Sequence, residues 1–150
     1  MFERYTERAR RALFFARFAV STLGGTAIEA EHLLLGLLRE RRGFTSGLLA
    51  RACVDIEPLQ LEVEERIAVG ERIPASVEIP FSQETHRILQ SAGTEADRLG
   101  HDYIGAEHLL LAILCAQDNA AAQILSSNGI DADLVRQEIA RLAKGDKNEP

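Results

Sequence analysis

The stretch Ala30-Glu31-His32-Leu33-Leu34-Leu35 decides the fold, because it returns unchanged as Ala106-Glu107-His108-Leu109-Leu110-Leu111. Sliding the sequence on itself by 76 positions, the distance from Glu31 to Glu107, superposes the two stretches without a gap. The same shift pairs further residues: Leu13 with Leu89, Ala16 with Ala92, Leu23-Gly24 with Leu99-Gly100, Ile28 with Ile104, Leu49 with Leu125, and Asp55 with Asp131. Self-similarity at a fixed period indicates a duplicated structure, so the sequence predicts two copies of one unit.

Apolar residues recur in each copy at steps of three and four residues, which is the period of an amphipathic helix. In the first copy this pattern predicts helices at about 6–23, 31–39, 45–52 and 55–69. Gly24 and Gly25 end the first of them, because glycine readily adopts the left-handed conformation that closes a helix. Asp55 is a suitable N-cap for the fourth, as Asp131 is in the second copy. The predicted fold is all-α, an eight-helix bundle built of two pseudo-symmetric four-helix repeats.

The chain of 150 residues is expected to form one domain, since this length suits a single compact core. The expected parts are repeat one (1–69), a linker (70–80), repeat two (81–145) and a frayed polar tail (146–150). Pro74 and Pro80 prevent a continuous helix through the linker.

The charge balance argues against nucleic acid as a partner, because the formal net charge is -6 and phosphate binding needs clustered positive charge. The N-terminal residues carry charges where a secretory signal carries its apolar stretch. No apolar run approaches the roughly 20 residues of a membrane-spanning helix. We therefore expect a cytoplasmic protein without nucleic-acid or membrane partners. Cys53 and Cys115 are expected to be small buried apolar residues of a reducing compartment.

The sequence carries no motif of an enzyme. It lacks the Gly-x-x-x-x-Gly-Lys-Ser/Thr loop that cradles a nucleotide phosphate. His32 and His108 lack a second histidine at the helical spacing of zinc proteases, so a packing or local hydrogen-bonding role is expected for both. No catalytic residue, metal or cofactor is predicted.

Each copy combines a Leu-Gly stop with an Ile-x-x-Glu-His-Leu-Leu-Leu segment, and the first helix opens at Thr-Glu-Arg-Ala. The doubled motif resembles the N-terminal domain of the Clp family of ATP-driven protein unfoldases over essentially the full chain. Residues 2–9, 28–38 and 99–108 are particularly similar to the ClpC branch. The resemblance implies a non-enzymatic module that binds protein substrates, adaptor proteins and Clp ATPase or protease components. Two alternatives are a free-standing accessory of a Clp protease complex and a self-associating structural protein that forms a homodimer.

The resemblance also implies candidate sites for phosphorylated arginine. In ClpC-like relatives a carboxylate at the start of the second helix binds the guanidinium, and a hydroxyl at the start of the first helix binds the phosphate. The matching pairs are Glu31 with Thr6 and Glu107 with Ser82. Free helix amides suit a phosphate, but the same residue types also serve as N-caps and first-turn acids without any ligand. Glu29 adds a negative charge that would repel a phosphate.

Three phenylalanines break the symmetry between the repeats. Phe14, Phe15 and Phe18 lie on the side of the first helix opposite its apolar stripe. The matching residues of the second repeat are polar: Gln90, Ser91 and Thr94. Phe15 is expected to fill the seam between the repeats. Phe14 and Phe18 either join it there or form an exposed apolar patch, which usually marks a surface for protein binding or self-association.

Overall fold

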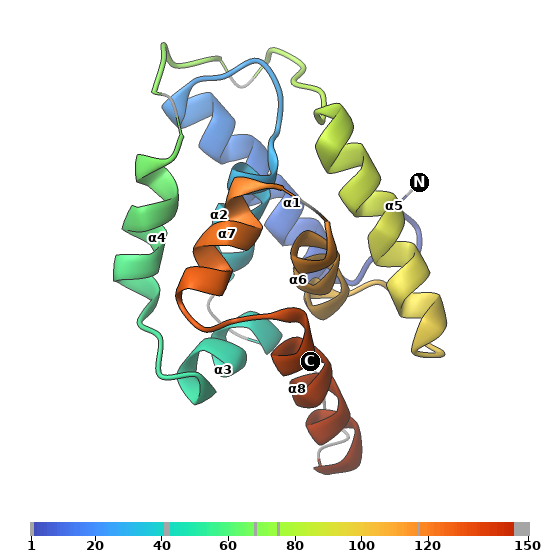
Figure 1. Cartoon of the computed structure of the whole chain (residues 1–150). Helices are drawn as coiled ribbons and strands as arrows, with labels where there is room; N and C mark the ends of the chain where they lie inside the picture. Colours follow the sequence, from blue (N-terminus) through green and yellow to red (C-terminus); the bar gives the residue numbers. More distant parts are fainter. Residues whose placement is uncertain (1, 41–42, 68, 75, 117, 146–150) are drawn as a thin grey trace.

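The computed structural model describes residues 2–40, 43–67, 69–74, 76–116 and 118–145. In Figure 1 these residues form eight helices and no strand. The helices are α1 (Glu7–Leu23), α2 (Ala30–Arg39), α3 (Phe44–Arg51), α4 (Ile56–Glu65), α5 (Gln83–Arg98), α6 (Ala106–Cys115), α7 (Ala120–Ser127) and α8 (Ala132–Gly145). The prediction of an all-α fold with four helices in each repeat is confirmed.

The helices of the first repeat begin and end within one residue of their predicted positions, except at the end of α4. This helix ends at Glu65 rather than at residue 69. The amide of Arg66 bonds to the Val63 carbonyl at 3.0 Å, and the next amide repeats this step of three residues. Such a tightened turn closes an α-helix. The predicted tail 146–150 lies outside the described residues.

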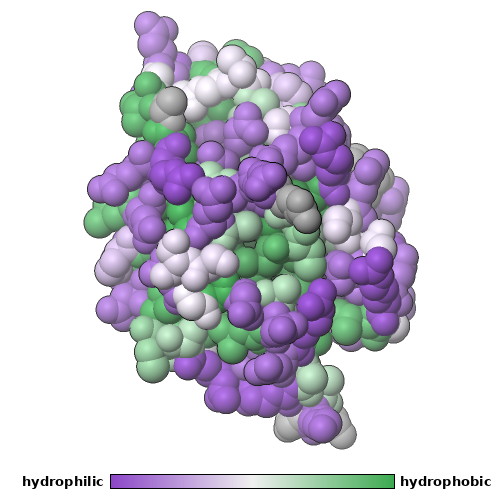
Figure 2. Space-filling model, in the orientation of Figure 1, coloured by the Kyte–Doolittle hydropathy of each residue, from purple (hydrophilic) through white to green (hydrophobic). Residues whose placement is uncertain are grey.

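The two leucine-rich helices α2 and α6 form the centre of the bundle. They contact each other, and each also packs against helices of both repeats. Seven of their nine leucines are almost fully buried: Leu33, Leu34, Leu37, Leu38, Leu109, Leu110 and Leu111. In Figure 1 α4 and α5 flank this centre on opposite sides. Figure 2 shows that polar residues cover most of the same face, while apolar residues show through in the middle. A helix that is apolar on all sides needs such a central position.

α1 and α2 form a tight antiparallel hairpin. Gly36 of α2 lies so close to α1 that a Cβ atom there would be 2.0 Å from the Ala12 carbonyl oxygen. Farther along, Glu40 at the end of α2 pairs with Arg11 near the start of α1, with 3.0 Å between Nη1 and Oε2. The start of α2 therefore lies at the opposite end of the hairpin from the start of α1.

Two isolated backbone bridges connect the repeats, Tyr5 with Ile104 and Ile28 with Phe81. The 76-residue shift converts one bridge into the other, because it moves Tyr5 onto Phe81 and Ile28 onto Ile104. Their hydrogen bonds also match: the Ile104 and Ile28 amides each donate across the bridge at 2.8 Å. The repeats are thus joined by a pseudo-two-fold contact, and the first helix of each begins against the other.

Both cysteines are exposed, so the expectation that they are buried is wrong. Cys53 lies in the turn after α3 with a φ of 60°, a left-handed conformation that turns favour. Cys115 is the last residue of α6, and the Arg136 guanidinium lies 3.6 Å from its sulfur. Each thiol thus lies just beyond the buried part of its helix. Both cysteines are free.

Candidate functional site

The residues expected to bind phosphoarginine form two crossed pairs. Because the α1–α2 hairpin is antiparallel, the 17 residues of α1 separate Thr6 from Glu31, a length of about 25 Å at the helical rise. The Thr6 amide instead bonds to the Ile104 carbonyl, two residues before α6, at 3.0 Å. The Ser82 amide bonds equivalently to Ile28, two residues before α2, at 3.1 Å. Pairing within one repeat is therefore wrong; the geometry pairs Thr6 with Glu107 and Ser82 with Glu31.

The Thr6–Glu107 pair combines a helix cap with a buried carboxylate. The Thr6 hydroxyl accepts a hydrogen bond from the Ala9 amide at 3.1 Å and so caps α1. Glu107 is only 5% exposed. Its carboxylate accepts a hydrogen bond from the Tyr103 hydroxyl at 3.4 Å. A guanidinium that binds Glu107 would take the place of this hydroxyl.

Two arginines bring positive charge to the cap of α1. Arg4 precedes Thr6, and Arg8 follows it in the first turn of the helix. Arg4 donates hydrogen bonds of 3.1 Å to the carbonyls of His101 and Asp102 in the turn between α5 and α6. Both arginines also pair with carboxylates of the protein, which compensates part of their charge. A phosphate at this cap would meet the free amides of α1, and the two arginines add positive charge to the start of the helix.

The Ser82–Glu31 pair lies among carboxylates. Ser82 caps α5, since its hydroxyl accepts a hydrogen bond from the Thr85 amide at 3.1 Å. Burial and the negative charges of Glu31 and Glu29 raise the pKa of the Glu84 carboxyl in the first turn of α5. The residues that match Glu29 and Glu84 at the other pair are Gly105 and Arg8. Arg87 offsets part of this negative charge, but the first turn of α5 and the start of α2 still place more carboxylates around Ser82 than the other pair has at the matching positions.

His32 and His108 make local hydrogen bonds at the starts of α2 and α6, as predicted. Their Nδ1 atoms accept hydrogen bonds from the amides of Glu29 and Gly105, each at 2.9 Å. The residue at the third position of each helix thus satisfies an amide that the helix leaves unpaired. Both rings are buried.

The Nε2 nitrogen of the buried histidine has a different environment in each repeat. Since Nδ1 of His108 accepts a hydrogen bond from the Gly105 amide, the ring proton lies on Nε2, which donates a hydrogen bond to His101 Nδ1 at 2.9 Å. Gly25 takes the place of His101 in the first repeat, and the buried His32 Nε2 has no partner among the described residues. Burial, followed by the charges of His101 and Arg4, lowers the pKa of His108 to about 4.

Phe14 and Phe18 are exposed on α1, with exposed fractions of 64% and 45%. Phe15 is half-buried and lines a groove with Leu35 of α2 and Gln60 of α4. All three of these helices belong to the first repeat. The expectation that Phe15 fills the seam between the repeats is therefore wrong, and Phe14 and Phe18 do not join a seam either.

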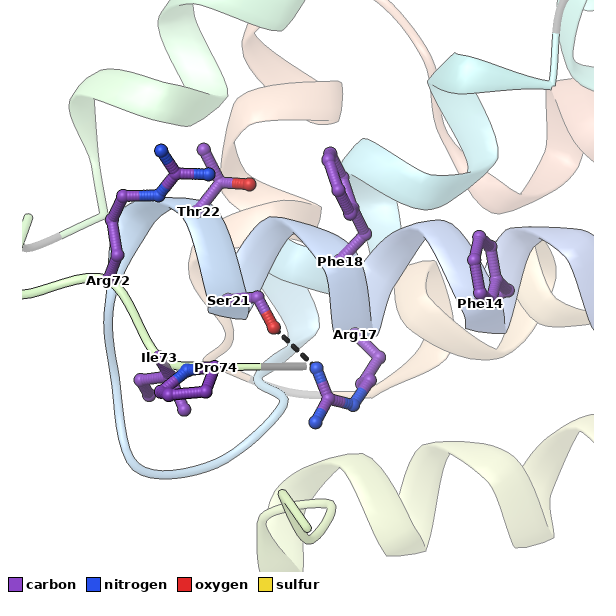
Figure 3. Close-up of a pocket in the computed structure, with 8 residues that line it drawn as sticks. All are labelled: Phe14, Arg17, Phe18, Ser21, Thr22, Arg72, Ile73 and Pro74. Carbon is purple, nitrogen blue, oxygen red and sulfur yellow. Dashed lines mark hydrogen bonds between the residues drawn. The ribbon is translucent and has the colours of Figure 1, made fainter. Parts of the chain in front are cut away.

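Two residues that no sequence pattern indicated share a groove with these phenylalanines. Ile73 and Pro74, in the connection between α4 and α5, line a cavity of about 550 Å³ together with Phe14 and Phe18 (Figure 3). The Ile73 amide donates a hydrogen bond to the Ser21 carbonyl at 2.9 Å, which holds the connection against the end of α1. No periodic pattern indicates where such a connection runs, so no sequence signal could have found this contact.

No three His, Cys, Asp or Glu side chains gather as a metal site requires within the described residues. In the same residues no single helix is long and apolar enough to cross a membrane; only α6 and α7 together pass that test, and they are bent by 97°. The expectations of no metal, no cofactor and no nucleic-acid partner stay predictions.

Comparison with known proteins decides the family. The profile of the family described as "Clp repeat (R) N-terminal domain" matches residues 4–128 and 80–149. The chain belongs to this family. The match in two segments agrees with the internal duplication, and the resemblance stated from the sequence is confirmed.

Relatives of this Clp N-terminal domain include chloroplast chaperones. "Chaperone protein ClpC1, chloroplastic" of Arabidopsis thaliana is 37% identical over 149 residues, which are 99% of this chain and 16% of that protein. The crystal structure of the ClpD N-terminal domain from Arabidopsis thaliana superposes with a TM-score of 0.75 at 27% identity, covering 97% of both chains. A structure described as "Peptide from EAEC T6SS Sci1 SciI protein" contains a chain with a TM-score of 0.70 at 22% identity, covering 95% of this chain and 88% of that one.

The chain spans about one sixth of the length of the curated relatives it matches. The named relative is chloroplastic, and the cytoplasmic location expected for this chain stays a prediction.

Proposed function

We propose that this Clp N-terminal domain receives substrate proteins or adaptor proteins for a Clp-type ATP-dependent unfoldase or protease. The observation that carries the proposal is the family match, which includes both repeats. The bundle is also suited to binding, because buried leucines support its helices while α1 exposes two phenylalanines. Exposed apolar side chains that lie together usually mark a surface for other proteins.

An unfolded protein is expected to bind this domain at micromolar concentration, because it exposes the apolar side chains that a folded protein buries. The probe is a fluorescent protein substrate that has been reduced and carboxymethylated, so that it stays unfolded. Its fluorescence anisotropy is measured against increasing concentrations of the domain, and the native disulfide-bonded form of the same protein is the control. Equal binding of both forms, or binding of neither, would contradict the proposed function.

Within this function, we propose that the domain reads phosphorylated arginine through the Thr6–Glu107 pair alone. There the phosphate contacts the amides at the start of α1, beside Arg4 and Arg8. The guanidinium binds the Glu107 carboxylate in place of the Tyr103 hydroxyl. At the other pair, the carboxylates of Glu29 and Glu84 would repel the phosphate, and Arg87 offsets only part of their charge.

A phosphoarginine peptide is expected to bind with a stoichiometry of one. Thr6→Val and Glu107→Gln should each weaken binding at least about tenfold, since each removes a charge-assisted hydrogen bond to the ligand. Isothermal titration calorimetry measures both quantities. Ser82→Ala and Glu31→Gln are the matched controls and should leave the affinity unchanged, with the fold of each variant checked by circular dichroism.

A gain-of-function variant tests the charge argument directly. Glu29→Gly with Glu84→Arg gives the Ser82–Glu31 pair the residues that the other pair has at these two positions, and the stoichiometry should rise from one to two. A parent protein that binds two peptides, or none, would disprove the proposed asymmetry. Either result would leave the proposed binding of unfolded proteins standing, because that binding uses another surface.

A further inference from the structure

The exposed phenylalanines of α1 separate two neighbouring grooves. The first groove is the cavity of about 550 Å³ described above, which Ile73 and Pro74 close on one side. The second lies between α1, α2 and α4 and contains Phe15 and Leu35. Phe18 lines both grooves, as does Thr22, so together they form one continuous apolar surface. In Figure 3 Phe14 and Phe18 project from the same side of α1.

Arginines surround this apolar surface. The Arg39 guanidinium lies 5.0 Å from the centre of the Phe15 ring and 5.5 Å from that of Phe18. Arg17 and Arg72 line the first groove. Arg17 donates a hydrogen bond to the Ser21 hydroxyl within α1 and another to the Val77 carbonyl, and the second bond holds the connection. The surface is thus basic at its edges.

The acidic residues of the chain are mostly placed elsewhere. Among the described residues that line the two grooves, Glu64 is the one carboxylate against three guanidinium groups. The whole chain, in contrast, has a net charge of -6. A partner that carries carboxylates beside its apolar side chains is therefore complementary to this surface, and a basic partner is not.

The secondary structure of the domain favours a helical partner. One common way to bind an extended peptide is to add it as a strand to the edge of a sheet, where its backbone groups find partners. The described residues offer no such edge, because they form helices and only two isolated bridges. A helix satisfies its own backbone groups and can place apolar side chains three and four residues apart into the grooves.

A second copy of this chain is a poor occupant of the surface. In a two-fold contact the same patch faces itself. Arg17, Arg39 and Arg72 of one copy would then approach the same three arginines of the other, and like charges disfavour such an interface.

We propose that the surface around Phe14 and Phe18 is a docking site for an acidic amphipathic helix of a partner protein. This inference rests on the proposed protein-binding function and names the chemistry of one partner class. The helix lays its apolar face over Phe18, into both grooves, and its flanking carboxylates pair with Arg17, Arg39 and Arg72. The second repeat has no such site, because Gln90 and Thr94 replace the two phenylalanines.

Two synthetic helical peptides test the proposal. Both carry leucines at positions i, i+3, i+4 and i+7; one has glutamates at the remaining positions and the other has lysines. Fluorescence anisotropy should show at least about tenfold tighter binding of the glutamate peptide, a preference that weakens as salt is added. Equal binding of the two peptides would disprove the charge complementarity.

Variants of the domain locate the site. Phe14→Ser with Phe18→Ser should weaken the binding of the glutamate peptide at least about tenfold. The helicity of the domain should be retained, because both side chains are exposed. Arg39→Gln with Arg72→Gln should remove the preference for glutamate over lysine. The matched control is Gln90→Ser with Thr94→Ser on α5, where both residues are exposed, and it should have no effect.

Three results would overturn the proposal. They are unchanged peptide binding by the phenylalanine double variant, a dimer in size-exclusion chromatography that this variant abolishes, and binding to anionic lipid vesicles that it abolishes while the peptide does not bind. If the glutamate peptide does not bind but the unfolded protein does, the proposed docking site is wrong and the protein-binding function stands. If both fail, the function itself is wrong.

Discussion

Replacing Gly36 with alanine is expected to lower the free energy of unfolding by about 3 kcal/mol, the upper part of the range for an overpacked core. The new Cβ atom would lie 2.0 Å from the Ala12 carbonyl oxygen and 3.0 Å from the Ala16 amide nitrogen. These are backbone atoms in the middle of α1, so no side-chain rotation relieves the clash. The α1–α2 hairpin must open, which separates surfaces that are now fully buried. Urea unfolding followed by circular dichroism measures the loss.

Two matched substitutions separate this clash from the ordinary effect of a methyl group in a helix. Gly47 of α3 is exposed and has nothing within 4 Å of its added Cβ, so Gly47→Ala should raise stability by about 0.5–1 kcal/mol. Ala112 holds the position of Gly36 in the second repeat, and Ala112→Gly should cost only about 1 kcal/mol. A Gly36→Ala protein as stable as the parent would show that the hairpin tolerates a wider separation.

Acid is expected to destabilise the domain through His108, by about 3 kcal/mol between pH 6.5 and pH 4. The ring is buried and uncharged when folded, and its folded pKa of about 4 lies below the unfolded value of 6.5. Between these values the unfolded state binds more protons than the folded state, so stability is present above pH 6.5 and is lost as the pH falls towards 4. Burial also lowers the pKa of His32, which acts in the same direction.

Comparison with His108→Asn isolates this contribution from that of the carboxyl groups. Asparagine keeps an acceptor for the Gly105 amide but does not titrate, so the variant should be less stable at neutral pH and should lose less stability on acidification. Urea unfolding at a series of pH values gives the two slopes. Equal slopes in parent and variant would mean that His108 does not couple folding to pH.

The helices were predictable because their signals are local. Periodic leucines, the Gly24 stop and the Thr6 cap each act within a few residues of the structure they form. The first error was at α4, where two amides turn back by three residues and end the helix early. The cysteines were a second error, because residue type alone does not show that a side chain lies just past the end of a buried stretch.

The candidate sites were only half predictable. The residue types at Thr6, Ser82, Glu31 and Glu107 are readable from the sequence, and so are their positions at helix starts. Their partners were assigned to the wrong repeat, because the duplication suggests that each copy is complete in itself. The two backbone bridges contradict this, since they join residues 99 and 53 positions apart.

The sequence by itself determined that this is a duplicated helical protein, where its helices begin, and which leucines form its core, since neighbouring residues in the chain encode all of these. Only the tertiary structure decided that each helix cap lies at a backbone bridge to the other repeat, and that Ile73 and Pro74 line a groove together with Phe14 and Phe18. The physical reason is that both contacts depend on how distant segments pack and pair their backbones. A local pattern of apolar and polar residues does not indicate which distant segments pack together.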